Sequence, residues 1–296
     1  MTQSPIFLVS GAGGHLGRRV VELLLAQGAG RVIAGSRSPD KLADLAAKGA
    51  ETRKVDFDDP ELATAFEGVD RLLIISTDAL GEPGWRLRQH KAAIAAAQKA
   101  GVKHVVYTSM PNPEPGSPIP FAPDHLGSEQ ALAASSFNWT VLRNSWYAEN
   151  LHYSLPQVLA SGQWYTSAGE GRTSYVTRED CAQAAAAALI GASNQNSRYD
   201  ITGSEALSVD DIASIAGEVF GKAINVVQLS DEQLAQGMAA AGVPAPFVPL
   251  FVSFDANARS GRIADVSGDV ARLTGRAPQK LRDFLAANKA AFQPAA

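Results

Sequence analysis

The chain has 296 residues, of which 46% are hydrophobic and 19% charged, enough apolar material to bury a sizeable core and to exclude a wholly disordered protein. Its 26 basic and 30 acidic residues give a net charge of −4 with no cluster of Lys and Arg, so nucleic acid is not the expected partner. The chain has one cysteine, Cys181, so no internal disulfide is expected. Its five histidines lack the spacing of metal ligands, so no metal site is expected either.

No targeting or membrane-spanning segment is expected. The apolar run at 6–9 is too short for a signal peptide, and no basic residue precedes it. The longest small-residue run, at 182–190, is interrupted by Gln183 and is typical of a buried helix rather than a transmembrane one. We therefore expect a cytoplasmic protein with no membrane partner.

Strands and helices are expected to alternate through the first half of the chain. Apolar runs of strand length lie at 5–10, 31–35, 52–55, 71–76, 102–109 and 139–143. Helical patterns lie between them at 18–27, 38–47, 59–66, 85–100 and 128–135. Most of these strands are apolar throughout, so both faces are buried, which predicts a doubly wound α/β fold. Right-handed crossovers then give a Rossmann-type parallel sheet of order 3-2-1-4-5-6, with ligands at the carboxyl ends of its strands.

The pattern changes after residue 145. Helical patterns dominate at 148–160, 178–191, 208–220, 230–241, 265–274 and 278–291, with short strands at 164–166, 199–201 and 223–229. We therefore predict an NADP(H)-binding domain over 1–145 and a smaller, mainly helical, substrate-binding lobe over 146–296 that packs on the sheet. The apolar stretch 243–252 is expected to close the substrate pocket or to form a subunit contact in a homodimer.

A glycine-rich turn, residues 11–17, lies directly after the first predicted strand and before the first predicted helix. It reads Gly11-Ala12-Gly13-Gly14-His15-Leu16-Gly17. The first glycine suits the tight turn, the second lets backbone N–H groups approach a pyrophosphate, and the third lets the helix pack closely on the sheet. This spacing in a strand–turn–helix context predicts dinucleotide binding by residues 11–17.

The end of the second predicted strand favours NADP(H) over NAD(H). An acidic residue about 20 positions beyond the glycines would bind the ribose 2′-hydroxyl of NAD. Here Arg37 takes that place, and Lys41 follows one helical turn later. A guanidinium binds a 2′-phosphate with two parallel hydrogen bonds. The alternative is that both side chains are solvent-exposed on a loop and bind no ligand.

Other strand ends point to the same crevice. Asp56 and Phe57 after the third strand are candidates to flank the adenine, although Asp56 could equally cap a turn. Ser76 and Thr77 after the fourth strand are expected near the pyrophosphate or the nicotinamide ribose. Their shared place at the carboxyl edge of the sheet supports these assignments.

Several segments together resemble the NmrA-like, atypical short-chain dehydrogenases. They are residues 11–17, 37–41, 75–76, 100–109, 142–150, 168–171 and 177–182. Within that family the chain is most similar to the bacterial NADPH:quinone oxidoreductases, with triphenylmethane-dye reductases as close relatives. The resemblance thins after about residue 205.

The resemblance implies which residues hold NADPH and what the protein does with it. NADPH would be held by residues 11–17, Arg37, the turn Ser76-Thr77-Asp78 and the sixth strand end at Asn144, Ser145 and Trp146. Ser109 stands where short-chain dehydrogenases carry their catalytic serine. The implied activity is two-electron reduction of a quinone without flavin or metal.

One departure from ordinary short-chain dehydrogenases concerns the catalytic pair Tyr-x-x-x-Lys, which is missing from the expected helix. His125 and Glu129 have that spacing instead, and one turn of helix places both on one face. His125 could donate a proton or orient a carbonyl, or it could be a structural histidine near a helix start.

The acceptor is expected to lie against the segment that follows the sixth strand. Asn144, Tyr147 and Asn150 are candidate hydrogen-bond donors, and Trp146 could stack on a flat acceptor or pack in the core. The proline-rich segment 110–123, which includes Phe121, would form a wall over the nicotinamide or a solvent loop.

We therefore predict NADPH-dependent quinone reduction by direct hydride transfer. Two alternatives remain. One is reduction of another conjugated acceptor, such as a dye, an enone or an aromatic intermediate. The other is a non-catalytic NADP(H)-sensing regulator, as NmrA itself is.

Overall fold

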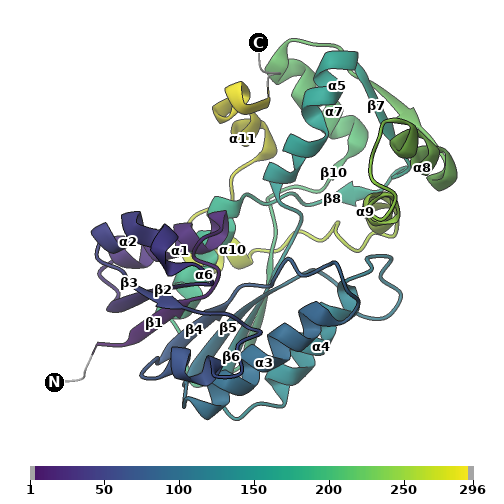
Figure 1. The fold of residues 1–296 in the computed structure, drawn as a ribbon. Coiled ribbons are helices and arrows are strands. Elements are labelled where there is room, and N and C mark those ends of the chain that lie inside the picture. Colours follow the sequence, from purple (N-terminus) through teal and green to yellow (C-terminus); the bar gives the residue numbers. More distant parts are fainter. Residues whose placement is uncertain (1–3, 293–296) are drawn as a thin grey trace.

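The computed structural model describes residues 4–292, and a seven-stranded parallel sheet forms the lower part of the molecule in Figure 1. Its order is β3-β2-β1-β4-β5-β6-β9. The strands are β1 (Ile6–Val9), β2 (Arg31–Ser36), β3 (Glu51–Lys54), β4 (Arg71–Ile74), β5 (His104–Ser109), β6 (Asn138–Asn144) and β9 (Ser197–Ile201). The predicted order of the first six strands is confirmed, and the second half of the chain adds β9 beside β6.

Helices cover both faces of this sheet because alternate residues of each strand point to opposite sides. Phe7 and Val9 of β1 belong to the core under α1 (His15–Ala26) and α6 (Arg178–Ile190). Leu8, between them, belongs to the core under α3 (Trp85–Lys99) and α4 (Ala122–Ala133). The two cores hold the carboxyl ends of the strands at one edge.

The helices of the first half differ from the predicted ones in length and type. The predicted helix 38–47 is the 3₁₀ turn η1 (Pro39–Leu42) followed by α2 (Ala43–Ala47), and the predicted helix 59–66 is the 3₁₀ turn η2 (Leu62–Phe66). Helix α4 begins at Ala122 rather than near 128, because Pro123 is compatible with a first helical turn. His125 and Glu129 therefore both lie within the helix.

The upper part of the molecule is a mainly helical lobe (Figure 1). Its elements are η3 (Ala148–Tyr153), α5 (Leu155–Ser161), β7 (Gln163–Thr166), β8 (Arg172–Thr173), β10 (Leu207–Ser208), α7 (Val209–Phe220), β11 (Asn225–Gln228), α8 (Asp231–Ala240), α9 (Val248–Arg259), α11 (Leu281–Ala287) and η4 (Lys289–Phe292). Ser208 and Ser230 cap α7 and α8 through reciprocal hydrogen bonds. Among residues 4–292, no helix has the length and apolar character needed to cross a membrane.

The chain returns to the sheet after entering the lobe. Besides β9, helix α6 packs against α1, and α10 (Asp269–Thr274) packs against α6 and β9. The predicted domain boundary at residue 145 stays a prediction, and these three elements of the predicted lobe 146–296 lie on the sheet. The outermost residues of the two predicted domains, 1–3 and 293–296, lie outside the described residues.

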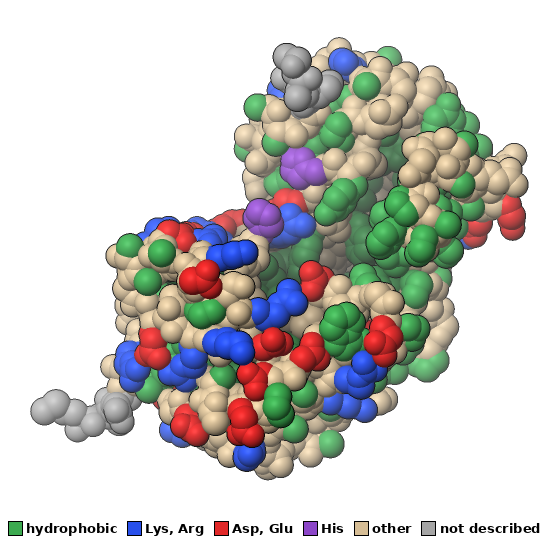
Figure 2. All heavy atoms as spheres, viewed as in Figure 1, with side chains coloured by type: hydrophobic (Ala, Val, Ile, Leu, Met, Phe, Trp, Pro, Cys, Tyr) green, Lys and Arg blue, Asp and Glu red, His purple; other side chains and the backbone are tan. Residues whose placement is uncertain are grey.

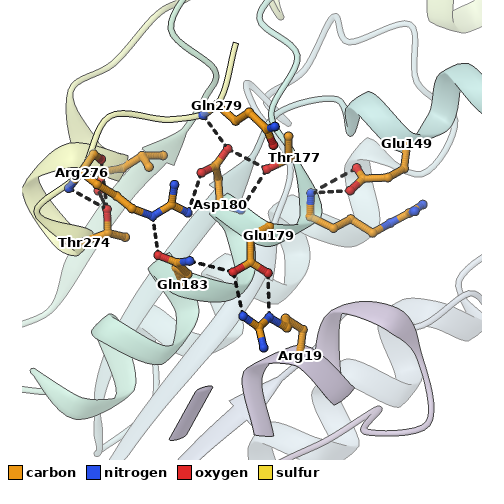
Figure 3. A network of polar contacts seen from close by, with 11 residues as sticks. Arg19, Glu149, Thr177, Glu179, Asp180, Gln183, Thr274, Arg276 and Gln279 are labelled. Atoms are coloured by element: carbon orange, nitrogen blue, oxygen red, sulfur yellow. Dashed lines mark hydrogen bonds and ion pairs between the residues drawn. The ribbon is translucent and has the colours of Figure 1, made fainter. Parts of the chain in front are cut away.

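A polar network at the start of α6 joins the segments that return to the sheet (Figure 3). Glu179 accepts two hydrogen bonds from Arg19 of α1. The buried carboxylate of Asp180 accepts from the Thr177 hydroxyl at 2.7 Å and the Gln279 amide at 3.0 Å, and it pairs with Arg276 at 2.9 Å. The network thereby anchors both α1 and the segment that leads to α11.

The glycine-rich turn brings α1 unusually close to β1. A Cβ atom added at Gly17 would lie 2.4 Å from the carbonyl oxygen of Gly11, closer than real Cβ atoms approach an oxygen. The turn itself is closed by the Gly14 amide, which donates to that same oxygen at 2.9 Å. Because backbone lies on both sides of the contact, a larger residue at 17 has no room.

We expect Gly17→Ala to lower the free energy of unfolding by about 2 kcal/mol or more, since the added methyl group must displace backbone. Gly237→Ala is the matched control. Gly237 is an exposed residue inside α8 with nothing near its missing Cβ, so alanine there should raise stability by about 0.5–1 kcal/mol. Urea unfolding of the two variants measures both effects. Equal effects of the two substitutions would contradict the close approach of α1 and β1.

Candidate active site

A cavity of about 510 Å³ lies at the carboxyl ends of β1, β2 and β4. Nine of the residues predicted to bind the cofactor line it: Gly11, Gly13, Gly14, Arg37, Asp56, Phe57, Ser76, Thr77 and Asp78. Residues that the sequence analysis did not select line it as well: Ser10, Ser36, Val55, Ile75, Ala79, Leu80, Gly81, Trp85 and Gln89. Segments from four separate parts of the chain thus meet in one crevice.

The glycine-rich turn, residues 11–17, gives this cavity a backbone wall suited to an anion. Gly14 is the N-cap of α1, and Gly11 has the left-handed φ of +65° that the tight turn requires. Among the described residues, no side chain caps α1, and its first turn holds no acid. The amide groups and the positive end of the helix dipole therefore face the cavity without a competing carboxylate.

The other residues of the glycine-rich turn shape it from behind. The Ala12 amide donates to the Gly35 carbonyl at 2.9 Å, and the Leu16 side chain is buried in the core under α1. His15 is exposed. That Ala12, His15, Leu16 and Gly17 bind the cofactor directly stays a prediction.

Arg37 stands at the β2 end of the cavity with a free guanidinium. It is exposed and makes no ion pair or side-chain hydrogen bond with any residue from 4 to 292. Lys41, in η1, is exposed too, but it does not line the cavity. Asp56 accepts a hydrogen bond from the Asp58 amide at 3.1 Å, so it caps a turn while it lines the cavity.

Side chains at the end of β1, on β5 and on α3 hold the turn Ser76-Thr77-Asp78 in place. The Ile75 amide donates to the Ser10 hydroxyl at 2.9 Å, and the Ser76 amide donates to the Thr108 hydroxyl at 2.9 Å. The Thr77 amide donates to Nε2 of His90 at 3.0 Å. The backbone of this turn is therefore already held in place before a cofactor binds across it.

His90 and Tyr107, which the sequence analysis did not select, form a buried hydrogen-bonded chain with His125. Nε2 of His90 accepts from Thr77, so Nδ1 carries the proton of the neutral ring and donates to the Ser128 hydroxyl at 2.9 Å and to Tyr107 at 3.2 Å. The Tyr107 hydroxyl then donates to Nδ1 of His125 at 3.0 Å. His125 is left with its proton on Nε2.

Burial keeps both histidines neutral. Desolvation and the charge of Arg86 lower the pKa of His90 to about 3. The same two causes hold the pKa of His125 well below its usual value. His125 is thus a neutral hydrogen-bond donor at physiological pH.

Glu129, one turn along α4 from His125, belongs to a separate buried cluster. Its carboxylate accepts two hydrogen bonds from Arg143, at 3.0 and 2.8 Å, and one from the Ser109 hydroxyl at 2.6 Å. Arg143 also pairs with Glu114 of the proline-rich segment at 2.6 Å. Ser109 therefore forms a hydrogen bond with Glu129 and does not line the cavity. Its role as a cofactor-binding residue stays a prediction.

The proline-rich segment 110–123 is fixed by the lobe. The Arg262 guanidinium donates to the carbonyl oxygens of Asn112, Glu114 and Pro115 at 3.0, 3.4 and 3.1 Å. Phe254 of α9 packs against Met110, Ile119 and Ala122 and lies 4.4 Å from the Trp146 ring. These contacts are consistent with the predicted wall rather than a free solvent loop.

The residues after β6 bring together the predicted acceptor site. Asn144 donates through Nδ2 to the Tyr147 hydroxyl at 3.1 Å. Asn150 accepts from Arg178 at 3.4 Å, and the Arg178 guanidinium lies 5.3 Å from the Tyr147 ring. Ser145 is buried and bonds to Ser174 at 3.0 Å. Asn144, Ser145 and Trp146 do not line the cavity itself, so their contact with the cofactor stays a prediction.

The molecular surface is hollowed between the sheet domain and the lobe, and hydrophobic side chains line the hollow (Figure 2). Nine buried side-chain polar atoms lack a hydrogen-bond partner among the described residues, and four of them belong to the helix, turn and strand ends discussed above: Thr77 Oγ1, Arg86 Nε, Gln89 Oε1 and Asn144 Oδ1. Thr77 and Gln89 line the cavity. Such atoms suit a ligand that brings its own hydroxyl and carboxamide groups, as a nicotinamide nucleotide does. Within residues 4–292, no group of three or more His, Cys, Asp or Glu side chains could hold a metal ion.

Known proteins resemble this chain in sequence and in fold. Residues 11–190 match the family model described as NAD(P)H-binding. Quinone oxidoreductase 2 of Escherichia coli (strain K12) is 34% identical over 269 residues, which cover 90% of this chain and 93% of that protein. This chain belongs to the NAD(P)H-binding family, among the NmrA-like, atypical short-chain dehydrogenases. The resemblance inferred from its motifs is confirmed.

Solved structures of this family have the same fold. An NADPH-dependent quinone oxidoreductase from Escherichia coli, complexed with NADPH, has a TM-score of 0.88 and 32% identity, with 95% of this chain and 99% of that chain covered. The triphenylmethane reductase of Citrobacter sp., complexed with NADP(H), has a TM-score of 0.88 and 33% identity, with 97% and 99% covered.

The buried histidines should make stability depend on pH. In the unfolded chain these histidines take up protons near pH 6.5, whereas in the folded chain they stay neutral to a much lower pH. The free energy of unfolding is therefore highest above pH 6.5 and decreases as the pH falls below it. At pH 5 the loss is about 2 kcal/mol for His90, whose pKa in the folded chain is about 3, and His125 acts in the same direction. Urea unfolding at pH 7.5 and pH 5.0 measures it.

His125→Gln should reduce that pH-dependent loss, by at most about 2 kcal/mol between pH 7.5 and 5.0, because one buried histidine is removed. His15→Gln is the control, since His15 is exposed at the first residue of α1 and its replacement should leave the loss unchanged. A pH dependence that is the same in His125→Gln and in the unsubstituted protein would contradict the neutral buried state of His125.

Proposed function

We propose that this protein reduces quinones with NADPH by direct hydride transfer, without flavin or metal. The observation that carries the proposal is the single cavity that runs from Arg37, past the glycine-rich turn, to Thr77 and Asp78. The similarity to a quinone oxidoreductase over most of both chains supports the acceptor class.

Arg37 accounts for the choice of NADPH. Its guanidinium is unpaired and reaches the cavity from the end of β2, where a ribose 2′-phosphate would lie beside it. Asp56, also at this end, is turned toward the Asp58 amide and fixes the local backbone. The glycine-rich turn would receive the pyrophosphate on its amides.

Reduced nicotinamide, when bound, supplies a hydride to an electron-poor acceptor. The chain's own residues have three tasks in that reaction. His90 and Thr108 fix the turn 76–78 under the nicotinamide end, which limits the motion of the reacting groups. The wall formed by 110–123, Phe254 and Trp146 excludes water from the acceptor. Neutral His125 and the Asn144–Tyr147 pair offer N–H and O–H groups to an acceptor oxygen.

A quinone needs little further help, which agrees with the missing Tyr-x-x-x-Lys pair. Its reduction product is an aromatic hydroquinone anion, so no strong acid has to protonate it during the transfer. Orientation and hydrogen bonds to the developing charge are sufficient. The similarity to triphenylmethane reductase favours another flat conjugated acceptor as the second candidate.

Arg37→Ala should weaken NADPH binding about 10- to 100-fold and leave NADH binding almost unchanged, because only NADPH carries the 2′-phosphate. Arg31→Ala is the matched control, an exposed arginine at the other end of the same strand that pairs with Glu51. Fluorescence titration with both nucleotides gives the dissociation constants. An equal loss for NADPH and NADH would contradict the assignment of Arg37.

The proposed activity is tested by the absorbance of reduced nicotinamide in the presence of benzoquinones and naphthoquinones, a triphenylmethane dye and no acceptor. We expect quinone-dependent oxidation that is faster with NADPH than with NADH. Oxidation only with the dye would favour the second candidate. Tight NADP(H) binding without oxidation by any acceptor would contradict the proposal and favour a sensing role.

A further inference from the structure

Arg86 is a buried cation without a hydrogen-bonding or ion-pair partner among the described residues. Only 7% of its surface is exposed, and its guanidinium makes no hydrogen bond or ion pair with any residue from 4 to 292. Nε is fully shut off from solvent. Burying a charge without a partner is strongly unfavourable, so natural folds rarely keep such a group unless it has another use.

Its place on α3 increases that penalty. Gly84 is the N-cap of this helix, so Arg86 lies in the first turn, at the positive end of the helix dipole, and no acid accompanies it there. Burial lowers the pKa of Arg86, although the charges of Asp124 and Asp78 act in the opposite direction. A cation at this position stabilises neither the helix nor the sheet beneath it.

Arg86 does not line the cofactor cavity itself, but its surroundings include residues of that cavity and of the proline-rich segment 110–123. Its helix neighbours Trp85 and Gln89 line the cavity. The Phe121 ring of the proline-rich wall lies 5.0 Å from the guanidinium. The groups whose charges favour its cationic form are Tyr107, Asp124, Tyr147 and Asp78, and neither acid comes within the 4.0 Å of an ion pair.

We propose that Arg86 binds the acceptor oxygen on which negative charge develops, and that it thereby selects neutral carbonyl acceptors over cationic ones. This inference rests on the proposed function. The quinone takes a hydrogen with both electrons of the C–H bond that breaks in the reduced nicotinamide. It becomes a hydroquinone monoanion, which then takes one proton from water. The guanidinium donates to the charged oxygen, and the low polarity around it strengthens that interaction.

The same charge works against a cationic acceptor. A triphenylmethane dye carries a positive charge that disappears on reduction, and it has no carbonyl oxygen to accept from the guanidinium. Arg86 would repel such a dye in its bound state. The sign of the charge at this position therefore discriminates between the two acceptor classes.

Arg86→Met and Arg86→Lys test the inference in the full-length protein with NADPH as the reductant. For 1,4-benzoquinone, Arg86→Met should lower kcat/KM about 100-fold, and Arg86→Lys should restore part of the loss. For the cationic dye crystal violet, kcat/KM should stay equal or rise. The dissociation constant of NADPH should change less than two-fold. Arg88→Met, an exposed arginine on the same helix that pairs with Glu82, is the control and should change none of these.

A structural role for Arg86, as a cation resting on the Phe121 ring, gives the opposite result for stability. Under the proposal the thermal midpoint of Arg86→Met without nucleotide rises, because an unpaired buried charge is removed. A lower midpoint together with equal loss for both acceptors would overturn the proposal. So would a benzoquinone kcat/KM within two-fold of the unsubstituted protein.

Binding of 4-nitrophenolate to the protein with NADP⁺ separates this inference from the proposed function. We expect the phenolate to bind the unsubstituted protein at least ten-fold more tightly than Arg86→Met, and neutral nitrobenzene to bind both alike. If benzoquinone is not reduced but the phenolate depends on Arg86, the proposed function fails and the anion site stands. If benzoquinone is reduced and the phenolate binds both proteins equally, the anion site fails alone.

Discussion

The contact between Gly17 and Gly11 sets the position of α1 at the carboxyl edge of the sheet, on which the cofactor cavity depends. Without a side chain at 17, α1 lies directly on the turn that leaves β1, and its amide end is presented to the cavity. The pairing of β1 with β2 and β4 brings the cavity walls from those two strands within reach of one ligand. A dinucleotide can therefore meet the helix end, the Arg37 guanidinium and the 76–78 turn at once.

Helix α3 connects that cofactor edge to the acceptor side. His90 supports the Thr77 amide, Gln89 lines the cavity, and Arg86 faces the Phe121 wall, all within two turns of one helix. Its buried face carries charge and unpaired polar atoms where a stable fold would carry apolar groups. This is the usual signature of a site in which stability is given up for function.

Patterns that are local in sequence predicted the sheet order, the glycine-rich turn and Arg37, because strand burial and turn geometry depend on neighbouring residues. His90, Tyr107 and Arg86 were missed because each acts through partners on other elements. The Ala-rich stretch 85–100 was interpreted as an ordinary helix, although Arg86, Gln89 and His90 have the spacing of one helix face. A polar stripe on a helix that otherwise packs in the core is the sequence signal from which these residues could have been predicted. The addition of β9 to the sheet depends on long-range pairing that no local pattern encodes.

The central claim is that this chain passes a hydride from bound NADPH straight to a quinone. A single-turnover reaction tests it most directly: the protein is loaded with NADPH that carries deuterium at both C4 positions and mixed with 1,4-benzoquinone. Direct transfer predicts a decay of the reduced-nicotinamide absorbance that requires the protein and is slowed several-fold by deuterium. A decay that occurs equally without the protein, or that deuterium leaves unchanged, would contradict the claim.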